Sequence, residues 1–422
     1  MKAFVIAGTH SGVGKTTVSI GLMAEFRRQG ISVQAFKIGP DYIDPSYHRL
    51  ATGRPSRNLD TWLCSKTAVK QSFARAASEI NVVEGVMGLF DGAKGGKGST
   101  AEIARLLTLP VILVVDAKGM AQSAGALVAG YANYQPATRI AGVIFNRVAS
   151  AGHYDYLKKA VKIPSLGWIA KNKDMHLPER HLGLVPANER TPDIAKIRKN
   201  VVAHLDVKKL LSLSEIPKPK ASVLPMQKKR VRIAYALDTA FHFYYQDNLD
   251  LLAAAGATLV PFSPLSDKKL PDVDLLYFGG GFPECFEKQL RENKGFCEAL
   301  RAWDLPIYAE CGGLYYLSLI GKIPGKMHMR DRLQHFGYAE AISQVDTCLV
   351  RKGEKIKGHM FHYSHWEGQP NLYVFEKRGK TISEGYVDTQ IHASFLHVHF
   401  GSSPKLARRL VEAAQKTKEV CA

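Results

Sequence analysis

The stretch Gly8-Thr9-His10-Ser11-Gly12-Val13-Gly14-Lys15-Thr16-Thr17 decides the fold of the first half of the chain. An apolar run over residues 4–7 precedes it and an amphipathic run over 18–28 follows it, which predicts a strand, a glycine-rich turn and a helix. In such a turn, backbone N–H groups converge on phosphate oxygens, Lys15 supplies positive charge, and the Thr16 hydroxyl can coordinate Mg²⁺. We interpret the stretch as a phosphate-binding loop. Its predicted nucleotide-binding residues are Gly12, Gly14, Lys15, Thr16 and Thr17.

Apolar strands and amphipathic helices alternate after this loop. The predicted strands span residues 32–38, 80–84, 110–116 and 139–146, and the predicted helices span 66–78, 100–107 and 120–134. Continuously apolar strands separated by helices indicate a parallel sheet that is covered on both faces. Ligands of such sheets bind at the carboxyl ends of the strands, so the residues at those ends are the candidates for a site.

Acidic residues gather at these strand ends, where the phosphates of a nucleotide would lie. They are Asp41, Asp44, Asp60, Glu84 and Asp91. Carboxylates beside a polyphosphate commonly bind Mg²⁺, but each aspartate could instead cap a helix or hold a turn. Glu84 ends an apolar strand, where an unpaired acid is costly, and this favours a metal-binding role for it most strongly.

A segment rich in Pro, Lys and Ser, residues 212–230, predicts a linker. Beyond it, predicted strands at 231–237, 259–262 and 275–278 and a helix at 247–255 indicate a second α/β domain. We therefore predict two doubly wound α/β domains. The predicted boundaries are 1–211 for the first domain, 212–230 for the linker and 231–422 for the second domain.

Cys311 is the candidate nucleophile of the second domain. It follows an apolar strand, precedes Gly312-Gly313 and a helical pattern, and so is predicted on a tight strand-to-helix turn. The N–H of Gly312, with that of Gly280 or Gly281, could form an oxyanion hole. The alternative, a small buried thiol without chemistry, does not explain the glycines around it.

A free thiol needs a nearby imidazole or helix N-terminus to become thiolate at neutral pH. The segment 393–400 offers His397 and His399, which would point to opposite faces of a strand, so only one of them can serve the cysteine. A second histidine group, His359, His362 and His365, invites a zinc site. We instead predict a hairpin between residues 351–357 and 363–366, in which a spacing of three alternates faces.

Composition narrows the function classes. The 422 residues are 46% apolar, and no run reaches the roughly 18 apolar residues of a membrane span. Because the phosphate loop follows Met1 so closely, we expect no removable signal peptide and a cytoplasmic protein. None of the six cysteines forms a CxxC pair, which disfavours disulfides and thiolate metal sites. A net charge of +19 indicates an anionic partner, either nucleic acid or a polycarboxylate with ATP, although a generally basic host proteome would give the same charge without a function.

Three motifs in the first half resemble the cobyrinic acid a,c-diamide synthase family. They are the phosphate loop, the Lys-Ile-Gly-Pro-Asp-Tyr-Ile-Asp-Pro run at 37–45, and Glu-Gly-Val-Met-Gly-Leu-Phe-Asp-Gly at 84–92. The synthetase domain of that family is related to dethiobiotin synthetase, whose loop has the same extra residue after its first glycine, here Gly8. The resemblance implies that Thr16, Asp60 and Glu84 bind Mg²⁺ and that Lys15 and Lys37 contact phosphates. It also implies that Asn146 reads adenine, although a strand-end turn role for Asn146 stays open.

The second half resembles the class I glutamine amidotransferase domain fused to the same synthases. The matching motifs are Glu-Cys-Gly-Gly-Leu at 310–314 and His-x-His-Phe at 397–400, and they imply that His397 is the catalytic base. The more familiar His-Pro-Glu ending is absent, so the third triad residue stays unassigned. Residues 358–364 resemble the family's Gly-His-Glu-Phe-His-Tyr-Ser, with Met360 in place of the acid.

The resemblance implies an ATP-dependent ligase that amidates the a and c carboxylates of cobyrinic acid through an acyl phosphate, with glutamine as donor and Mg²⁺ as cofactor. Asp41, Asp44 and Asp91 are candidates for holding the tetrapyrrole or the metal. Hydrogenobyrinic acid and nickel-sirohydrochlorin or siroheme-type macrocycles are the alternative substrates, and a homodimer is left open.

Two other function classes are weaker. A nucleotide switch would carry a noncatalytic second domain, which has no need of Cys311, Gly312 and His397 together. A nucleic-acid binder would cluster its cations, but the lysines and arginines are dispersed, with one run at 228–230. We therefore expect no nucleic-acid partner and no membrane partner.

Overall fold

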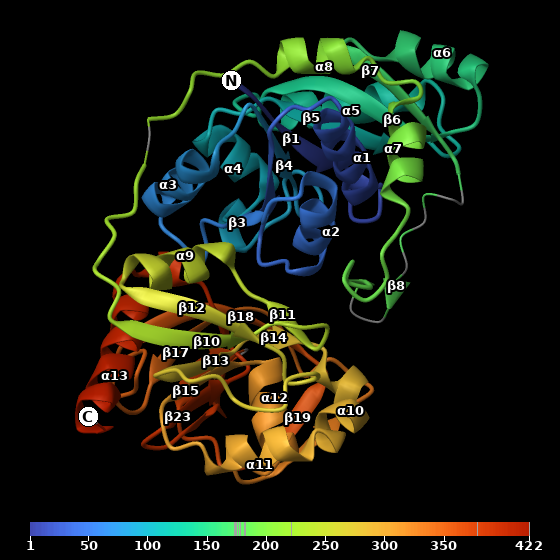
Figure 1. The fold of residues 1–422 in the computed structure, drawn as a ribbon. Coiled ribbons are helices and arrows are strands. Elements are labelled where there is room, and N and C mark those ends of the chain that lie inside the picture. Colours follow the sequence, from blue (N-terminus) through green and yellow to red (C-terminus); the bar gives the residue numbers. More distant parts are fainter. Residues whose placement is uncertain are drawn as a thin grey trace. The chain divides into compact units, whose positions relative to one another are not determined.

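The structure is a computed structural model, and it describes residues 1–172, 175, 177, 179–180, 183–220, 222–377 and 379–421. The chain divides into two compact units, Met1–Val223 and Leu224–Ala422 (Figure 1). The division falls inside the segment predicted as a linker. The domain boundaries at residues 211 and 231 remain a prediction.

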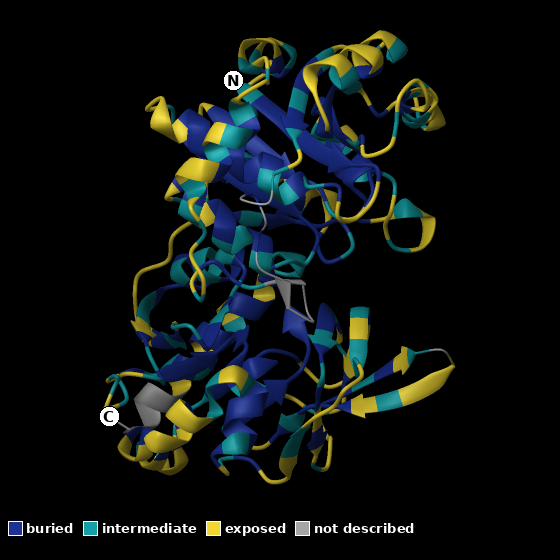
Figure 2. Ribbon diagram, turned by 90° about the vertical axis from the view of Figure 1, so that its right-hand side faces the viewer, coloured by how far each residue is buried: buried dark blue, intermediate teal, exposed yellow. Residues whose placement is uncertain are grey.

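The first unit is built on a seven-stranded sheet with the order β3-β2-β4-β1-β5-β6-β7. Its strands are β1 (Lys2–Gly8), β2 (Val33–Ile38), β3 (Arg57–Leu59), β4 (Ile80–Glu84), β5 (Val111–Asp116), β6 (Ile140–Val148) and β7 (Ser165–Ala170). All of these pairings are parallel. The apolar strands are buried, as Figure 2 shows, because helices cover the sheet. The predicted parallel sheet is confirmed.

Helices connect the strands of this unit. They are α1 (Lys15–Arg28), α2 (Ile43–Thr52), α3 (Lys66–Ala76), α4 (Thr100–Leu106), α5 (Ser123–Tyr134), α6 (Ala151–Ala160), α7 (Ile194–Val202) and α8 (Val207–Leu213). Gly21 lets α1 and α7 approach closely, since a Cβ there would lie 2.5 Å from the Cβ of Val201. The two helices lie side by side in Figure 1. The remaining short elements are a 3-10 turn at Lys94–Gly96 and the strands β8 (Glu179–Arg180) and β9 (Gly183–Leu184).

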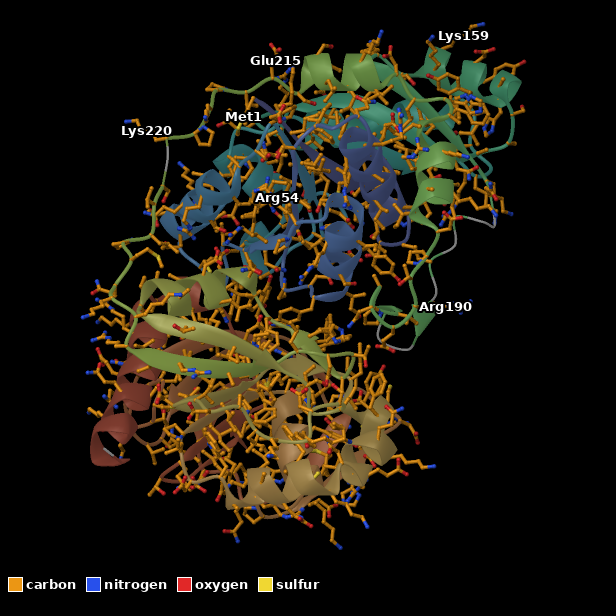
Figure 3. The ribbon with its side chains drawn as sticks, viewed as in Figure 1. Met1, Arg54, Lys159, Arg190, Glu215 and Lys220 are labelled. Atoms are coloured by element: carbon orange, nitrogen blue, oxygen red, sulfur yellow. The ribbon has the colours of Figure 1, made fainter. Side chains whose placement is uncertain are left out.

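The end of the first unit returns to the start of the chain. Ile216 N donates a hydrogen bond to Met1 O at 3.0 Å, and Ala3 N donates to Ser214 O at 2.9 Å. Met1 and Glu215 lie close together in Figure 3. Residues 214–216, which the sequence placed in the linker, are therefore hydrogen-bonded along the first strand.

The second unit has a six-stranded sheet with the order β12-β10-β13-β15-β23-β22. These strands are β10 (Val231–Ala236), β12 (Ala257–Phe262), β13 (Leu275–Phe278), β15 (Ile307–Glu310), β22 (Tyr386–Val387) and β23 (Ile391–Ser394). They run parallel except β22, which is antiparallel to β23. The helices of this unit are α9 (Gln246–Ala254), α10 (Glu287–Glu292), α11 (Lys294–Ala302), α12 (Gly312–Leu319) and α13 (Lys405–Cys421), with 3-10 turns at Pro283–Phe286 and Phe400–Ser402.

A five-stranded antiparallel sheet, absent from the sequence prediction, completes this unit. Its order is β21-β20-β17-β18-β24. Its strands are β17 (His335–Ser343), β18 (Lys355–His362), β20 (Tyr373–Lys377), β21 (Lys380–Glu384) and β24 (His397–Val398). Two further ribbons pair β11 (Phe241–Phe243) with β14 (Gly280–Gly281) and β16 (Lys326–Met329) with β19 (Ser364–Glu367).

The predicted hairpin between 351–357 and 363–366 is wrong. β18 pairs with β17 and β24, whereas β19 pairs with β16. The two segments thus belong to different sheets, because β18 pairs with the preceding strand β17 instead of the following strand β19. In the part of the chain that the structure describes, none of the helices is both long and apolar enough to cross a bilayer.

Candidate active sites

The phosphate-binding loop joins β1 to α1. Gly12 and Gly14 have φ angles of 82° and 97°, which favour glycine because a side chain is strained there. Asn146, at the end of β6, lies against the loop, and its Nδ2 donates to Val13 O at 2.8 Å. A Cβ on Gly14 would lie 2.3 Å from that Nδ2. Asn146 therefore braces the loop, and its predicted contact with adenine stays a prediction.

Lys15 lies within this loop with its ammonium group turned inward. Its Nζ donates to Met87 O at 2.6 Å and to His10 O at 3.3 Å. Burial and the nearby charge of Lys37 lower the pKa of Lys15 to about 8. The side chain is thus held beside the loop, where the outer phosphates of a nucleotide would be contacted.

Glu84 is the centre of a buried cluster at the edge of the sheet. Thr16 Oγ1 donates to Glu84 Oε1 at 2.7 Å, and Lys37 Nζ donates to the same oxygen at 3.1 Å. The other oxygen, Oε2, lies 2.7 Å from His48 Nε2. Lys37 Nζ also donates to Asp44 Oδ2 at 2.5 Å. The structure therefore brings together three of the predicted residues, Thr16, Lys37 and Glu84, with Asp44 beside them.

Opposite charges keep Glu84 and Lys37 ionised despite their burial, whereas burial and Asp41 raise the pKa of Asp44. Burial would raise the pKa of Glu84, but Lys37 and His48 outweigh it and hold that pKa below its usual range. Burial would likewise lower the pKa of Lys37, but Asp44 and Glu84 hold it above its usual value. Glu84 is therefore a carboxylate at neutral pH, as a metal ligand must be.

Of the three predicted Mg²⁺ ligands, Thr16 and Glu84 are arranged to bind the ion together. The Thr16 hydroxyl and Glu84 carboxylate are adjacent hard oxygen donors beside the loop, which is what Mg²⁺ takes in phosphate sites. Asp60 follows β3, and its Oδ1 accepts hydrogen bonds from Trp62 N at 2.7 Å and Leu63 N at 2.9 Å. Asp60 thus holds its own turn, and its metal role stays a prediction.

Two of the remaining acids accept hydrogen bonds from backbone N–H groups. Asp41 Oδ1 accepts from Ile43 N at 2.8 Å, at the start of α2, which is the capping alternative that the sequence left open. Asp91 Oδ2 accepts from Gly88 N at 2.9 Å and stabilises the turn after β4. The predicted roles of Asp41, Asp44 and Asp91 toward substrate stay predictions.

Sequence reasoning missed two residues at this site. His48 bridges Ser56 Oγ, 3.0 Å from its Nδ1, and Glu84. It could have been found from the Asp44/His48 spacing of four had α2 been predicted. Arg147, with a φ of 59°, donates from Nη2 to Gly12 O at 2.8 Å and pairs with Asp116. No sequence signal indicated that contact.

The second site is built where β15 ends and α12 begins. Cys311 has a φ of 48° and a ψ of −99°, a strained backbone conformation for a residue other than glycine. Its N–H donates to Ser394 O on β23 at 2.7 Å, which fixes the turn. This is the geometry predicted for a nucleophile.

His397, on β24, faces this cysteine. Burial would lower the pKa of His397, but the charge of Cys311, a hydrogen bond with it, and Glu310 outweigh burial and raise that pKa to about 9. A protonated histidine beside a cysteine is the arrangement that favours a reactive thiolate. The structure thus brings together the predicted pair of Cys311 and His397.

The glycines predicted for the oxyanion hole lie beside this pair. A Cβ on Gly280 would lie 2.4 Å from His397 Cε1, and one on Gly312 would lie 3.1 Å from Gly281 N. The two glycine segments therefore meet at the site without side chains between them. Their role as an oxyanion hole stays a prediction.

The other histidines have separate partners. His399 Nδ1 accepts from Gly401 N at 3.0 Å and caps a 3-10 turn. His359 stacks on His397 with centroids 4.9 Å apart and lies 3.1 Å from the Tyr245 hydroxyl. His362 Nδ1 lies 2.8 Å from Ser364 O. Met360, the departure from the family motif, is 2% exposed within the core.

Comparison with known sequences agrees with both sites. Residues 4–185 match the family described as the CobQ/CobB/MinD/ParA nucleotide binding domain, and residues 232–405 match the CobB/CobQ-like glutamine amidotransferase domain. A cobyrinate a,c-diamide synthase from Listeria innocua is 42% identical, over 99% of this chain and 100% of the relative. Enzymes of the same name from Priestia megaterium and Caldanaerobacter subterraneus are 41% identical over 99% and 97% of this chain, and 98% of each relative.

Fold and sites together define a class of protein, in which a nucleotide-binding domain and a glutamine amidotransferase domain share one chain. Such proteins are ATP-dependent ligases that take nitrogen from glutamine. Within that class, the chain belongs to the cobyrinate a,c-diamide synthase family, which acts in cobalamin biosynthesis.

Proposed function

We propose that the chain amidates the a and c carboxylates of cobyrinic acid, using ATP and glutamine. The observation that carries the proposal is the presence of both sites, Thr16–Glu84–Lys37 and Cys311–His397, in a chain that matches cobyrinate a,c-diamide synthases over nearly its whole length.

The first half would activate the substrate. A carboxylate is a poor acyl donor, so the γ-phosphoryl group of ATP is transferred to it, and the resulting acyl phosphate has a good leaving group. Lys15, held in the loop, contacts the outer phosphates and offsets the charge that develops there. Thr16 and Glu84 would hold Mg²⁺, with Asp60 as the third predicted ligand. When bound, Mg²⁺ neutralises phosphate charge during the transfer.

The second half would supply ammonia. The Cys311 thiolate attacks the amide carbon of glutamine, and the amides of Gly280 or Gly281 and of Gly312 stabilise the oxyanion. His397 then protonates the departing ammonia. Water releases glutamate from the thioester and regenerates the thiol. Ammonia displaces phosphate from the acyl phosphate and forms the amide.

Mass spectrometry of the product tests the substrate. The protein is incubated with Mg²⁺·ATP, glutamine and either cobyrinic acid, hydrogenobyrinic acid or nickel-sirohydrochlorin. With cobyrinic acid we expect two successive losses of about one mass unit as each OH becomes NH₂. Turnover of another macrocycle in its place would keep the mechanism and overturn the substrate, and turnover of none would contradict the proposal.

A further inference from the structure

Glu310, the residue before the candidate nucleophile, is a buried acid of the Glu-Cys-Gly-Gly-Leu motif to which the sequence assigned no role. It ends β15 and is 1% exposed. Its Oε1 accepts hydrogen bonds from the Tyr308 hydroxyl at 2.5 Å and from Val398 N at 3.1 Å. Its Oε2 accepts from the Tyr277 hydroxyl at 3.2 Å. Three donors from three strands therefore fix this carboxylate in one orientation.

The fixed carboxylate faces the catalytic histidine. Glu310 Oε2 lies 3.8 Å from His397 Nδ1. The opposite side of the imidazole faces the glycine turn, since a Cβ on Gly280 would lie 2.4 Å from Cε1 and 3.3 Å from Nε2. One ring nitrogen thus faces the acid and the other faces the side where Cys311 and the glycine amides meet.

The charge of Glu310 is a second reason to connect it with His397. A buried carboxylate is costly unless it is paired, and in the described part of the chain His397 is the ion-pair partner of Glu310. The pair is complete when the imidazole carries its proton, which is the state that accompanies a Cys311 thiolate. The carboxylate therefore favours the reactive form of the site.

In the His-Pro-Glu ending, which this chain lacks, the third residue of the catalytic triad lies two positions after the histidine. Two residues after His397 stands His399, which caps a 3-10 turn. We propose that Glu310 takes this role as a positioning residue, orienting His397 and stabilising its imidazolium during glutamine hydrolysis. The inference rests on the glutaminase half of the proposed function.

The test is the variant Glu310→Gln, which keeps the size of the side chain, replaces one acceptor oxygen with an NH₂ group and removes the charge. We expect kcat for glutamine hydrolysis to fall by roughly 10²-fold with little change in KM, because the histidine is less well held. Because the imidazolium is less stabilised, the alkaline limb of kcat/KM should also move to lower pH. Amidation driven by ammonium should persist, which shows that the first unit still works.

The alkaline limb of the kcat/KM profile reports the deprotonation of His397. The titratable groups that face it are Cys311 at the turn before α12, Glu310 on β15, and His359 and His362 on β18. Burial lowers the pKa of His359 well below its usual value and that of His362 to about 3. Both are neutral across the range in which the limb is measured.

Two further variants separate the effect of the Glu310 charge on His397 from a general loss of protein stability. Glu310→Asp retains the charge and should keep the alkaline limb near its wild-type position. Glu384→Gln alters another buried acid of the same unit, one that accepts from Ser394 Oγ at 2.7 Å, and should leave the limb in place.

An unmoved limb in Glu310→Gln overturns the inference, as does equal loss of the glutamine-driven and ammonium-driven reactions. If Glu310→Gln does not fold, kcat of Glu310→Asp decides: its shorter side chain withdraws the carboxylate from His397 Nδ1, so a kcat for glutamine hydrolysis equal to that of Glu384→Gln overturns the inference. Absence of glutamine hydrolysis in the wild type would instead contradict the proposed function itself.

Discussion

At the scale of single residues, Glu84 joins three neighbours and carries the first prediction. Glu84→Gln keeps the shape of the side chain but removes the charge that faces Thr16, Lys37 and His48. We expect ammonium-driven amidation to fall by at least about 10²-fold and the Mg²⁺ concentration for half-maximal rate to rise. Steady-state rates at several Mg²⁺ concentrations measure both effects.

Glu102→Gln is the matched control for this change. Glu102 lies on α4 in the same unit, but it binds Thr61 and Gly98 instead of the cluster. Its variant should keep the wild-type Mg²⁺ requirement. An unchanged requirement in Glu84→Gln would contradict the metal role.

Glu384 carries a prediction about pH and stability. Burial raises its pKa from 4.5 to about 7, against hydrogen bonds from Ser394 and Phe395. Between these two values the folded protein binds the proton more tightly than the unfolded chain, so the free energy of unfolding falls as pH rises. The full difference amounts to about 3 kcal/mol at most.

Glu384→Gln should therefore flatten the fall of Tm between about pH 5 and pH 8, since a neutral side chain does not titrate. Thermal unfolding at several pH values measures this. Glu376→Gln, an exposed acid on the neighbouring strand β20, should leave the wild-type slope. A wild-type slope in Glu384→Gln would show that another group causes the pH dependence.

At the scale of elements, the phosphate loop depends on close backbone approach. Gly14→Ala combines a φ of 97° with a Cβ 2.3 Å from Asn146 Nδ2, so the loop must shift. We expect ATP affinity to fall at least about tenfold by calorimetry. Gly30→Ala has a similar φ of 77° but nothing within 4 Å, and should cost about 1 kcal/mol of stability without loss of ATP affinity. Equal ATP affinities in the two variants would contradict this account of the loop.

Long apolar strands could be predicted from the sequence because burial on both faces leaves a continuous pattern. β4 and β13 begin and end at the predicted residues. The antiparallel sheet was missed as a whole because two of its pairings join strands that are not consecutive, as His359 pairs with His397. Its other two pairings, β17 with β18 and β20 with β21, join consecutive strands. α2 was missed although its apolar residues recur at helical spacing, because Pro45 in its first turn is as typical of a turn as of a helix start.

The candidate sites show the same contrast between residues marked by a local sequence pattern and residues defined by distant partners. Cys311 and the phosphate loop could be predicted because glycines mark a strained turn within a short stretch. Glu310 was not assigned a role because its partner His397 lies on another element, and His48 was missed because α2 was not predicted. Sequence patterns likewise do not separate a capping aspartate such as Asp41 from a ligand, because the carboxylate is the same in both roles.

At the scale of the whole molecule, the account requires that two units with separate chemistry serve one reaction. The first unit holds the nucleotide site and the second holds the cysteine site. Neither chemistry alone amidates a carboxylate with glutamine nitrogen. A variant that removes the cysteine should therefore abolish use of glutamine and spare use of ammonium.

The most direct test follows the nitrogen atom. Wild type and Cys311→Ala are each incubated with cobyrinic acid, Mg²⁺·ATP, glutamine labelled with ¹⁵N in its amide, and unlabelled ammonium, and the product is analysed by mass spectrometry. The account predicts ¹⁵N in the amides made by the wild type, and unlabelled amides at a retained rate from the variant. Incorporation of ¹⁵N by Cys311→Ala, or only unlabelled amides from the wild type in this mixture, would contradict it.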